Sequence, residues 1–370
     1  MGNHKYRQIL EKLQDDITSG HYRPGKRLPS DSELVRRFGA SRMTVFRAMH
    51  ELQLLGLVTR RVGSGTFVST SSPTGSHVFG LLIPELGQTE IFEVICQGMM
   101  EAQEARHHAL LWGNAALQEH EHEKEQAAER LCEHYISRKV SGVFFAPVEF
   151  STNRVQSNHR IAAALDRARI PIVLLDRCLE PYPQRGKYDL VGIDNRRTGY
   201  LATEHLIRAG VRRVAFFARP NSAPTVDARI AGYREALLLQ GKKPSLDLVR
   251  IGDASDAKFV KSILKRDRPD AFVCANDHTA GNLMHTLLAL GKRIPDDIRI
   301  VGIDDVKYAR LLPVPLTTLH QPCRDIGRIA LTVMLDRIAN PDLPPRDVLL
   351  GCELVVRKSC GTAVKNSSRS

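Results

Sequence analysis

Residues 29–56, Pro29-Ser-Asp-Ser-Glu-Leu-Val-Arg-Arg-Phe-Gly-Ala-Ser-Arg-Met-Thr-Val-Phe-Arg-Ala-Met-His-Glu-Leu-Gln-Leu-Leu-Gly56, decide how the first part of the chain folds. The pattern predicts two short helices that meet at a tight turn. Ser30 and Glu33 have the spacing of a capping box at the start of the first helix, and Gly39 ends it. Ser41 can cap the second helix, along which apolar residues recur every three or four positions. These features predict a helix-turn-helix.

The first turns of the second helix are predicted to face outward, because its apolar stripe turns toward a core. Arg42, Thr44 and Arg47 lie there, and side chains at the start of such a helix can reach base edges in the DNA major groove. Phe46 could touch a thymine methyl group or pack into the domain. An ordinary helical hairpin with a solvated basic face would carry the same residues, so this stretch alone favours neither interpretation.

The flanking residues shift the balance toward DNA binding. Upstream, Tyr6, Ile9, Leu13 and Ile17 have the spacing of an amphipathic helix. Downstream, residues 57–68 predict a strand, a glycine turn and a second strand. A hairpin that follows a helix-turn-helix is a wing, which can lie along the minor groove.

The same segments carry a family resemblance. They are Tyr22-Arg-Pro-Gly-Lys-Arg-Leu-Pro-Ser30, Leu34, Ser41-Arg-Met-Thr-Val45, Leu52, Gly56-Leu-Val58 and Gly63-Ser-Gly-Thr-Phe-Val68. Residues 5–69 therefore resemble the winged-helix DNA-binding domain of the GntR family, although that family often has Arg where this chain has Phe46. The resemblance implies base contacts from Arg42 and Thr44, and the position of Arg47 on the same helix adds a third, with other residues holding phosphates. The predicted DNA-binding residues are Lys26, Arg27, Pro29, Ser30, Arg37, Ser41, Arg42, Met43, Thr44, Phe46, Arg47, Arg60, Arg61, Gly63, Ser64 and Gly65.

Charge and length agree with a small basic head on a larger body. The first 70 residues carry 12 Lys plus Arg and 6 Asp plus Glu, a net charge of +6. This is half of the chain's net charge of +12, in under a fifth of its 370 residues. That density fits a polyanion partner. The sequence shows no transmembrane segment or apolar signal core, and the seven cysteines form no CxxC pair. These observations predict a cytoplasmic protein with reduced thiols.

From Val78 onward, short apolar runs alternate with helix-length segments, which predicts parallel sheets covered by helices on both faces. The predicted strands are 78–84, 109–112, 142–147, 171–175, 190–193, 213–217, 271–275 and 298–303, and the predicted helices are 91–106, 119–138, 158–168, 196–209, 228–240, 256–266 and 278–290. So many βα units exceed one modest sheet, and we expect two doubly wound subdomains. The fold class is thus multidomain: an α+β winged head followed by an α/β body.

Polar residues directly follow several of these strands: Asp176-Arg177, Asp194-Asn195, Asn276-Asp277 and Asp304-Asp305, with Arg229 at the start of a helix. The carboxyl ends of the strands line the crevice where such folds bind ligands. Each pair alone could be a helix cap. Together they predict a hydrogen-bonding site for a polyhydroxylated ligand.

A second resemblance covers the body. Its segments are Val191-Gly-Ile-Asp-Asn195, Gly199-Tyr-Leu-Ala-Thr-Glu-His-Leu206, Ala228-Arg-Ile-Ala-Gly-Tyr233, Cys274-Ala-Asn-Asp-His-Thr-Ala-Gly281, Ile294-Pro-Asp-Asp-Ile-Arg-Ile-Val-Gly-Ile-Asp-Asp305, Pro315-Leu-Thr-Thr-Leu-His-Gln-Pro322 and Leu354-Val-Val-Arg-Lys-Ser359. Residues 78–358 resemble the effector domain of the LacI/GalR family, which is related to periplasmic binding proteins. The resemblance implies an effector site formed by Glu90, Phe92, Asp176, Arg177, Arg229, Asn276, Asp304 and Gln321.

The combination is similar to transcriptional regulators of the arabinose-repressor type. It implies a homodimer that binds double-stranded operator DNA under the control of a small effector, with a sugar favoured over a purine and a repressor over an activator. A ligand-independent DNA-binding dimer and a cytosolic sugar-binding protein are the alternatives. We expect no enzymatic activity, cofactor or metal site, because the sequence has no nucleophile–base motif, phosphate loop or zinc signature.

The predicted domain limits follow from these patterns. They are residues 1–69 for the head, 70–77 for a linker rich in Ser, Pro and Gly, 78–358 for the body and 359–370 for a disordered tail. The linker has no resemblance to the hinge helix that LacI-type regulators use. We therefore expect the effector to close the cleft, shift the dimer faces and change the spacing of two tethered heads.

Overall fold

The computed structural model describes residues 6, 9–10, 12–13, 15–17, 21–23, 25–54, 57–61, 65–68, 77–83, 90–113, 121–239, 241 and 248–362. Within these ranges, the side chains of residues 50–51, 53–54, 59, 61, 103, 106 and 121–123 are not described. The chain divides into two compact units, residues 1–77 and 78–370. Most of the predicted linker, residues 70–76, lies outside the described residues.

The first unit contains the predicted helix-turn-helix and wing. Its elements are α2 (Asp31–Phe38), α3 (Arg42–Leu54), β1 (Val58–Arg61) and the antiparallel β2 (Gly65–Val68). The capping box is confirmed: Glu33 N donates to Ser30 Oγ at 3.3 Å, and Ser30 N donates to Glu33 Oε2 at 2.6 Å. Gly39 ends α2 in the left-handed conformation at φ 57°. Leu34, Val45 and Leu52 are fully buried in the core of this unit.

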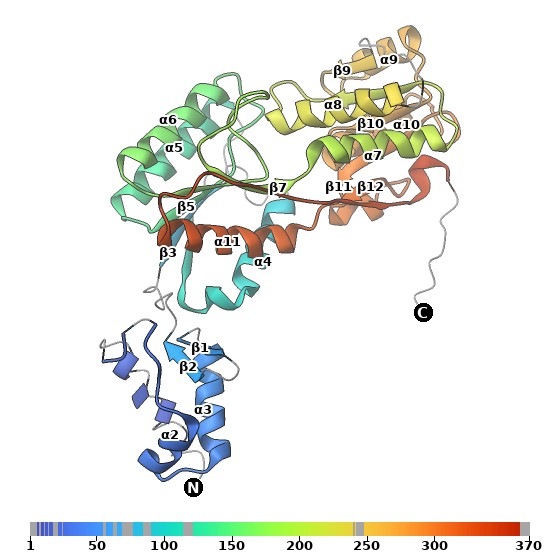
Figure 1. Ribbon diagram of the computed structural model, residues 1–370. Coiled ribbons are helices and arrows are strands. Elements are labelled where there is room, and N and C mark those ends of the chain that lie inside the picture. The colour runs from blue at the N-terminus through green and yellow to red at the C-terminus, as the bar shows by residue number, and fades with distance from the viewer. Residues whose placement is uncertain are drawn as a thin grey trace. The chain divides into compact units, whose positions relative to one another are not determined.

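The body contains two mostly parallel sheets, as predicted (Figure 1). The first has the order β13–β7–β6–β5–β3–β4, and every neighbouring pair in it is parallel. Its strands are β3 (Val78–Leu82), β4 (Ala109–Trp112), β5 (Gly142–Phe145), β6 (Ile172–Leu175), β7 (Asp189–Ile193) and β13 (Asp347–Leu350). The helices of this part are α4 (Glu90–Glu101), η1 (Gln103–His107), α5 (Glu121–Ser137), α6 (Arg154–Arg167) and α11 (Cys323–Ala339).

The second sheet has the order β14–β12–β11–β10–β8–β9, and only β14 is antiparallel to its neighbour among these described strands. Its strands are β8 (Val214–Ala218), β9 (Val249–Ile251), β10 (Ala271–Cys274), β11 (Arg299–Asp304), β12 (Thr317–His320) and β14 (Glu353–Val355). Its helices are α7 (Asn195–Arg208), α8 (Pro224–Leu239), α9 (Ala257–Arg266), α10 (Asp277–Ala289), η3 (Lys307–Arg310) and η4 (Lys358–Cys360).

The predicted strands and helices of the body are all present, with ends shifted by a few residues. The sequence interpretation did not include β9, β12, β13, β14 or α11. The missed strands have three or four residues, and β13 has no fully buried side chain, so they lack the continuous apolar run of a central strand. One limit is corrected: Ser359 and Cys360 are buried in η4 and do not belong to the tail predicted from residue 359, of which 363–370 lie outside the described residues.

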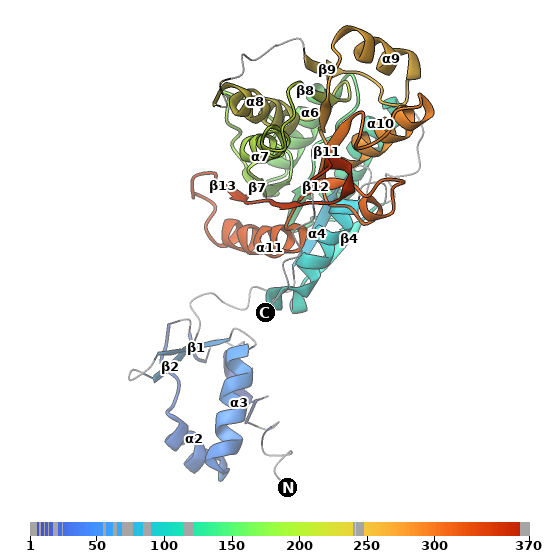
Figure 2. The same ribbon diagram turned by 90° about the vertical axis from the view of Figure 1, so that its right-hand side faces the viewer.

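Two pairs of helices pack at very short range, α4 beside α11 and α7 beside α8 (Figure 1, Figure 2). A Cβ atom on Gly98 would lie 2.1 Å from the Arg324 carbonyl oxygen, and one on Gly232 would lie 1.8 Å from that of Arg196. Only glycine permits these approaches. The two helix pairs are therefore closely packed, one on each sheet.

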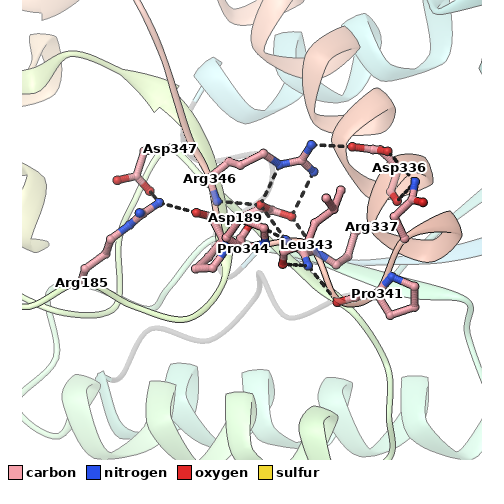
Figure 3. Close-up of polar contacts among 11 residues, drawn as sticks. Arg185, Asp189, Asp336, Arg337, Pro341, Leu343, Pro344, Arg346 and Asp347 are labelled. Carbon is pink, nitrogen blue, oxygen red and sulfur yellow. Dashed lines mark hydrogen bonds and ion pairs between the residues drawn. The ribbon is translucent and has the colours of Figure 1, made fainter.

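The chain crosses between the two subdomains three times: after β7, between β12 and α11, and between β13 and β14. The segment that returns to the first sheet is tied down by a buried carboxylate, Asp189 (Figure 3). Its side chain is 0 % exposed and lies 2.9 Å from Arg337 Nε and 3.3 Å from Arg346 Nε. This network joins the end of α11 and the start of β13 to the start of β7.

Candidate functional site

A cavity of about 300 Å³ lies between the two subdomains of the body, beyond the carboxyl ends of β6, β10 and β11. This is the edge at which the sequence predicts an effector site. Six of the eight predicted effector residues line the cavity: Glu90, Asp176, Arg177, Arg229, Asn276 and Asp304. Their roles toward a ligand stay predictions, and their geometry is described below.

Asp176 directly follows β6 in the left-handed conformation, at φ 63°. Its Oδ1 atom is buried and has no hydrogen-bond partner among the described residues. The neighbouring Arg177 is fully engaged: it forms an ion pair with Glu149, and its Nη1 donates to the Pro147 carbonyl at 3.0 Å. Asp176 thus offers the cavity an acceptor, whereas Arg177 fixes the wall behind it.

Phe92 is the first predicted effector residue that does not line the cavity. Its side chain is 1 % exposed, and its ring lies 5.1 Å from the Arg177 guanidinium carbon. It therefore supports Arg177 through a cation–π contact. The resemblance to the LacI/GalR family placed it near the ligand, but on α4 its side chain turns into the core.

Arg229 and Asn276 bring hydrogen-bond donors from the second subdomain. Arg229, on α8, donates from Nε to Asn195 Oδ1 at 2.7 Å and from Nη1 to the Ala275 carbonyl. Asn276 caps α10, because its Oδ1 accepts from Thr279 N at 2.9 Å. Neither Arg229 Nη2 nor Asn276 Nδ2 hydrogen-bonds to any residue in the described part of the chain. Both nitrogens can donate to a ligand.

Asp304 closes the end of β11 with an unusual backbone, at φ 127°. Gln321 Nε2 donates to its Oδ1 at 2.6 Å. Burial raises the pKa of Asp304 to about 7, and the nearby carboxylate of Asp176 adds to this rise while the Arg229 guanidinium opposes it. Asp304 therefore changes its charge near neutral pH.

Gln321, the second exception, lies at the crossing from β12 to α11. It lines an adjoining cavity of about 350 Å³ rather than the cleft, and it reaches the cleft only through Asp304. Its Oε1 atom is buried and has no partner in the described ranges. The two cavities share Glu90, Ile91, Asp304 and Val306.

Several hydrogen bonds join the two subdomains across the cleft. Phe150 N donates to the Asn221 carbonyl at 2.7 Å, and Ala223 N donates to Glu149 Oε2 at 3.2 Å. Lys307 N donates to Glu90 Oε2 at 2.6 Å. These three hydrogen bonds connect the subdomains in addition to the chain crossings.

The sequence interpretation missed cavity residues that do not follow a predicted strand directly, among them Lys124, Glu149, Phe150, Arg219 and Tyr308. Arg219 lies over the Phe150 ring, with 4.1 Å between its guanidinium carbon and the ring centroid. Arg219 comes one residue after β8, and Glu149 and Phe150 come four and five residues after β5. A search for polar or aromatic residues up to five positions after each strand, rather than directly after it, would have found these three. Lys124 lies on α5 and has no such signal in the sequence.

In the first unit, the residues predicted to contact DNA are exposed or half-buried wherever the structure describes their side chains. Ser41 Oγ accepts from Thr44 N at 3.2 Å, which confirms the predicted cap of α3, and it also bonds Thr44 Oγ1 at 2.8 Å. Arg47 lies over the Tyr6 ring, 4.7 Å from its centroid. Gly63 and Ser64 at the wing tip, and the side chain of Arg61, lie outside the described residues.

Arg60 and Arg27 make contacts within the head that the sequence does not predict. Arg60 forms a 2.8 Å ion pair with Asp31 and lies over the Phe46 ring at 5.8 Å. Arg27 covers Gly65, which has φ 112° and would place a Cβ atom 2.7 Å from Arg27 Nε. Both arginines therefore connect the wing to neighbouring parts of the head.

Comparisons with known proteins agree with the division of the chain into a head, residues 1–77, and a body, residues 78–370. Residues 5–68 match the model of bacterial regulatory proteins of the gntR family, and residues 203–360 match the periplasmic binding protein-like domain. The arabinose metabolism transcriptional repressor of Geobacillus stearothermophilus is 30% identical over 369 residues, which cover 96% of this chain and 97% of that protein. The regulator CelR of Thermobifida fusca is 35% identical over 53% of this chain and 58% of its own length.

Two solved structures show the same architecture. The complex of the regulator CelR with cellobiose has a TM-score of 0.65 and 25% identity, and covers 90% of this chain and 100% of that chain. The transcription regulator CcpA of Lactococcus lactis has a TM-score of 0.65 at 22% identity and covers 77% of this chain and 99% of its own. No described helix is both long enough and apolar enough to cross a membrane.

Proposed function

Because the chain belongs to the family of transcriptional repressors that join a gntR-type head to a periplasmic-binding-protein-like body, we propose that a sugar bound in its cleft controls how its head binds an operator. The names of two relatives, an arabinose metabolism repressor and a regulator bound to cellobiose, support a carbohydrate effector. The protein acts as a cytoplasmic homodimer, and each head contacts one half of a near-palindromic operator.

The pattern of donors and acceptors left over in the cavity carries this proposal. Asp176 Oδ1 is a buried acceptor without a partner in the described part of the body. Arg229 Nη2 and Asn276 Nδ2 are donors, and Asp304 adds a further carboxylate oxygen on the same cavity wall. A hydroxyl group both donates and accepts, so a ring with several hydroxyls can satisfy acceptors and donors together. An apolar ligand would leave Asp176 unpaired, which costs free energy.

The size of the cavity narrows the effector to a small sugar. Ligand sites range from about 300 to 1,000 Å³, and the volume of about 300 Å³ lies at the lower limit. We therefore expect one sugar ring in this cavity. The Phe150 ring and the Tyr308 side chain, which also line it, offer apolar surface to the faces of such a ring.

The effector acts through closure of the cleft. Asp176 belongs to the first subdomain, and Arg229, Asn276 and Asp304 belong to the second, so a ligand that bonds both favours the closed form. The hydrogen bonds from Phe150 N to the Asn221 carbonyl and from Lys307 N to Glu90 also join the two subdomains and would add to the stability of the closed form. A coupling of about 1–3 kcal/mol between cleft and operator is enough for a useful switch.

A thermal-shift screen of the full chain tests the proposal. The panel contains pentoses, hexoses, their phosphates, uronic acids and purines, and a ligand of the folded state raises the unfolding temperature. We expect a response to one monosaccharide, which is lost in Asp176→Ala, and operator binding that changes when that sugar is added. A response to purines alone would contradict a sugar effector, and silence across the panel would favour a ligand-independent dimer.

A further inference from the structure

Two large apolar side chains on α3 are exposed, in contrast to the other described apolar side chains of the first unit. Met43 is 74 % exposed and Phe46 is 49 % exposed, and no other large apolar side chain in the described residues 6–68 reaches that class. The other apolar side chains of α3 that the structure describes, such as Val45 and Leu52, are buried. Contiguous exposed apolar groups are a mark of interaction sites.

Met43 and Phe46 are neighbours on the helix surface, because they are three residues apart. They occupy the second and fifth positions of α3, within its first two turns. The core-facing stripe of Val45, Ala48 and Met49 lies on another side of the helix. The apolar pair is therefore on the side of α3 that is available to a partner, at the end that a recognition helix directs toward bases.

Basic side chains surround the pair. Arg60 lies over the Phe46 ring at 5.8 Å and is itself held by Asp31 at 2.8 Å. Arg42, next to Met43, is exposed. An apolar pair flanked by guanidinium groups fits the DNA major groove, where phosphates border the base edges. The same charges do not favour an apolar partner protein.

One base presents an apolar group in the major groove: thymine, through its C5-methyl group. We propose that Phe46 and Met43 read thymine methyl groups in each operator half-site, and that Arg60 positions the Phe46 ring for this contact. The inference rests on the proposed operator binding by the head. It assigns sequence reading by apolar contact to this helix, in addition to the hydrogen bonds expected from Arg42.

The test begins with an operator selected from random DNA by the wild-type full chain. Each thymine of the selected site is then replaced by deoxyuridine, which removes only the methyl group, and Kd is measured at fixed salt. Burial of one methyl group contributes about 0.8 kcal/mol, which is about fourfold in Kd. We expect a loss of about fourfold at one or two thymines of each half-site and no loss at the others.

The variant Phe46→Ala completes a double-mutant cycle with the DNA change. It should weaken binding to the thymine operator and become insensitive to deoxyuridine at the position that Phe46 reads, while its binding to unrelated DNA stays unchanged. Met43→Ala is compared in the same way, and Arg42→Ala is the matched control, because it should weaken binding and remain sensitive to deoxyuridine. A melting curve checks that each variant is folded.

Three results would overturn the inference: no thymine is sensitive to loss of its methyl group, Phe46→Ala keeps the full deoxyuridine penalty, or Phe46→Ala weakens specific and unrelated DNA equally. A selection that yields no preferred sequence would instead contradict operator recognition itself, so the two failures are distinguishable.

Discussion

Replacement of Asp189 tests whether the buried ion-pair network fixes the segment that returns to the first sheet. The carboxylate is fully buried, and it accepts hydrogen bonds from Arg337 Nε at 2.9 Å, Arg337 Nη2 at 3.1 Å and Arg346 N at 2.8 Å (Figure 3). The variant Asp189→Ala removes the charge and leaves two guanidinium groups facing a cavity. None of Asp189, Arg337 and Arg346 lines the cleft cavity or belongs to the predicted DNA-binding residues.

The expected magnitude follows from what each arginine retains. Loss of one partner of a buried ion pair costs about 3–5 kcal/mol. Arg337 still donates to the carbonyl oxygens of Pro341, at 3.0 Å, and Pro344, at 3.1 Å, and Arg346 keeps an ion pair with Asp336. We therefore expect the free energy of unfolding to fall by the lower end of this range, about 3 kcal/mol. For a unit of this size, that lowers the unfolding temperature by roughly 6 °C.

The effect should also depend on pH. Although burial opposes it, the hydrogen bonds from Arg337 and Arg346 hold the pKa of Asp189 below its usual range. A carboxyl whose native pKa is lowered stabilises the fold above its unfolded pKa, near 3.9, and this contribution is lost as the pH falls through the native pKa. The difference between wild type and Asp189→Ala should thus be full at pH 7 and shrink below about pH 4.

Differential scanning calorimetry of the full chain measures the shift, with Glu235→Ala as the matched control. Glu235 forms a single exposed ion pair with Arg196 at 2.8 Å, and exposed pairs contribute little, so the control should melt with the wild type. A shift for Asp189→Ala no larger than that of the control would refute the argument that this network anchors the returning segment.

Three further changes test the cleft and the head. Arg229→Lys keeps the charge but loses the fixed pair of bonds to Asn195 and Ala275, so calorimetric titration should show effector affinity weakened at least tenfold with operator affinity unchanged. In the wild type, effector affinity should fall as the pH drops below about 7, because the ionised Asp304 carboxylate is a stronger acceptor for a hydroxyl than the protonated carboxyl group; Asp304→Asn should abolish this pH dependence. Ser30→Ala removes the cap of α2 and should lower the unfolding free energy of the head by about 1 kcal/mol in urea denaturation.

The sequence predicts most of the head because its signals are local. The capping box, Gly39 and the apolar stripe of α3 each involve residues within one turn or two of each other. The central strands of the body are equally local, since each is a continuous buried run such as Ile172–Leu175. The missed strands depend on their neighbours instead: β12 contains two buried threonines, Thr317 and Thr318, which are accommodated by hydrogen bonds to Arg357 and Asp277.

The candidate site shows the same division in more detail. Position after a strand is readable from the sequence, and it located Asp176, Asn276 and Asp304 at one cavity. The direction in which a helical side chain points is harder to predict from the sequence. Phe92 was therefore assigned to the ligand site, although it packs beneath Arg177. The partners of Arg229, at Asn195 and Ala275, come from distant segments that only the fold brings together.

The sequence leaves open whether each polar residue after a strand is a helix cap or part of the ligand site. In the structure, one residue can be both. Asn276 caps α10 with its oxygen and retains its amide nitrogen for the cavity, because an amide has separate donor and acceptor ends. Asp194 is different: its carboxylate accepts from Arg197 N at 3.0 Å, it does not line the cavity, and the adjacent Asn195 acts through Arg229 instead. The question for each polar residue after a strand is therefore which of its atoms the fold has already used. By that criterion Asp176, whose Oδ1 has no partner in the described residues, is the first position at which a bound sugar should be sought.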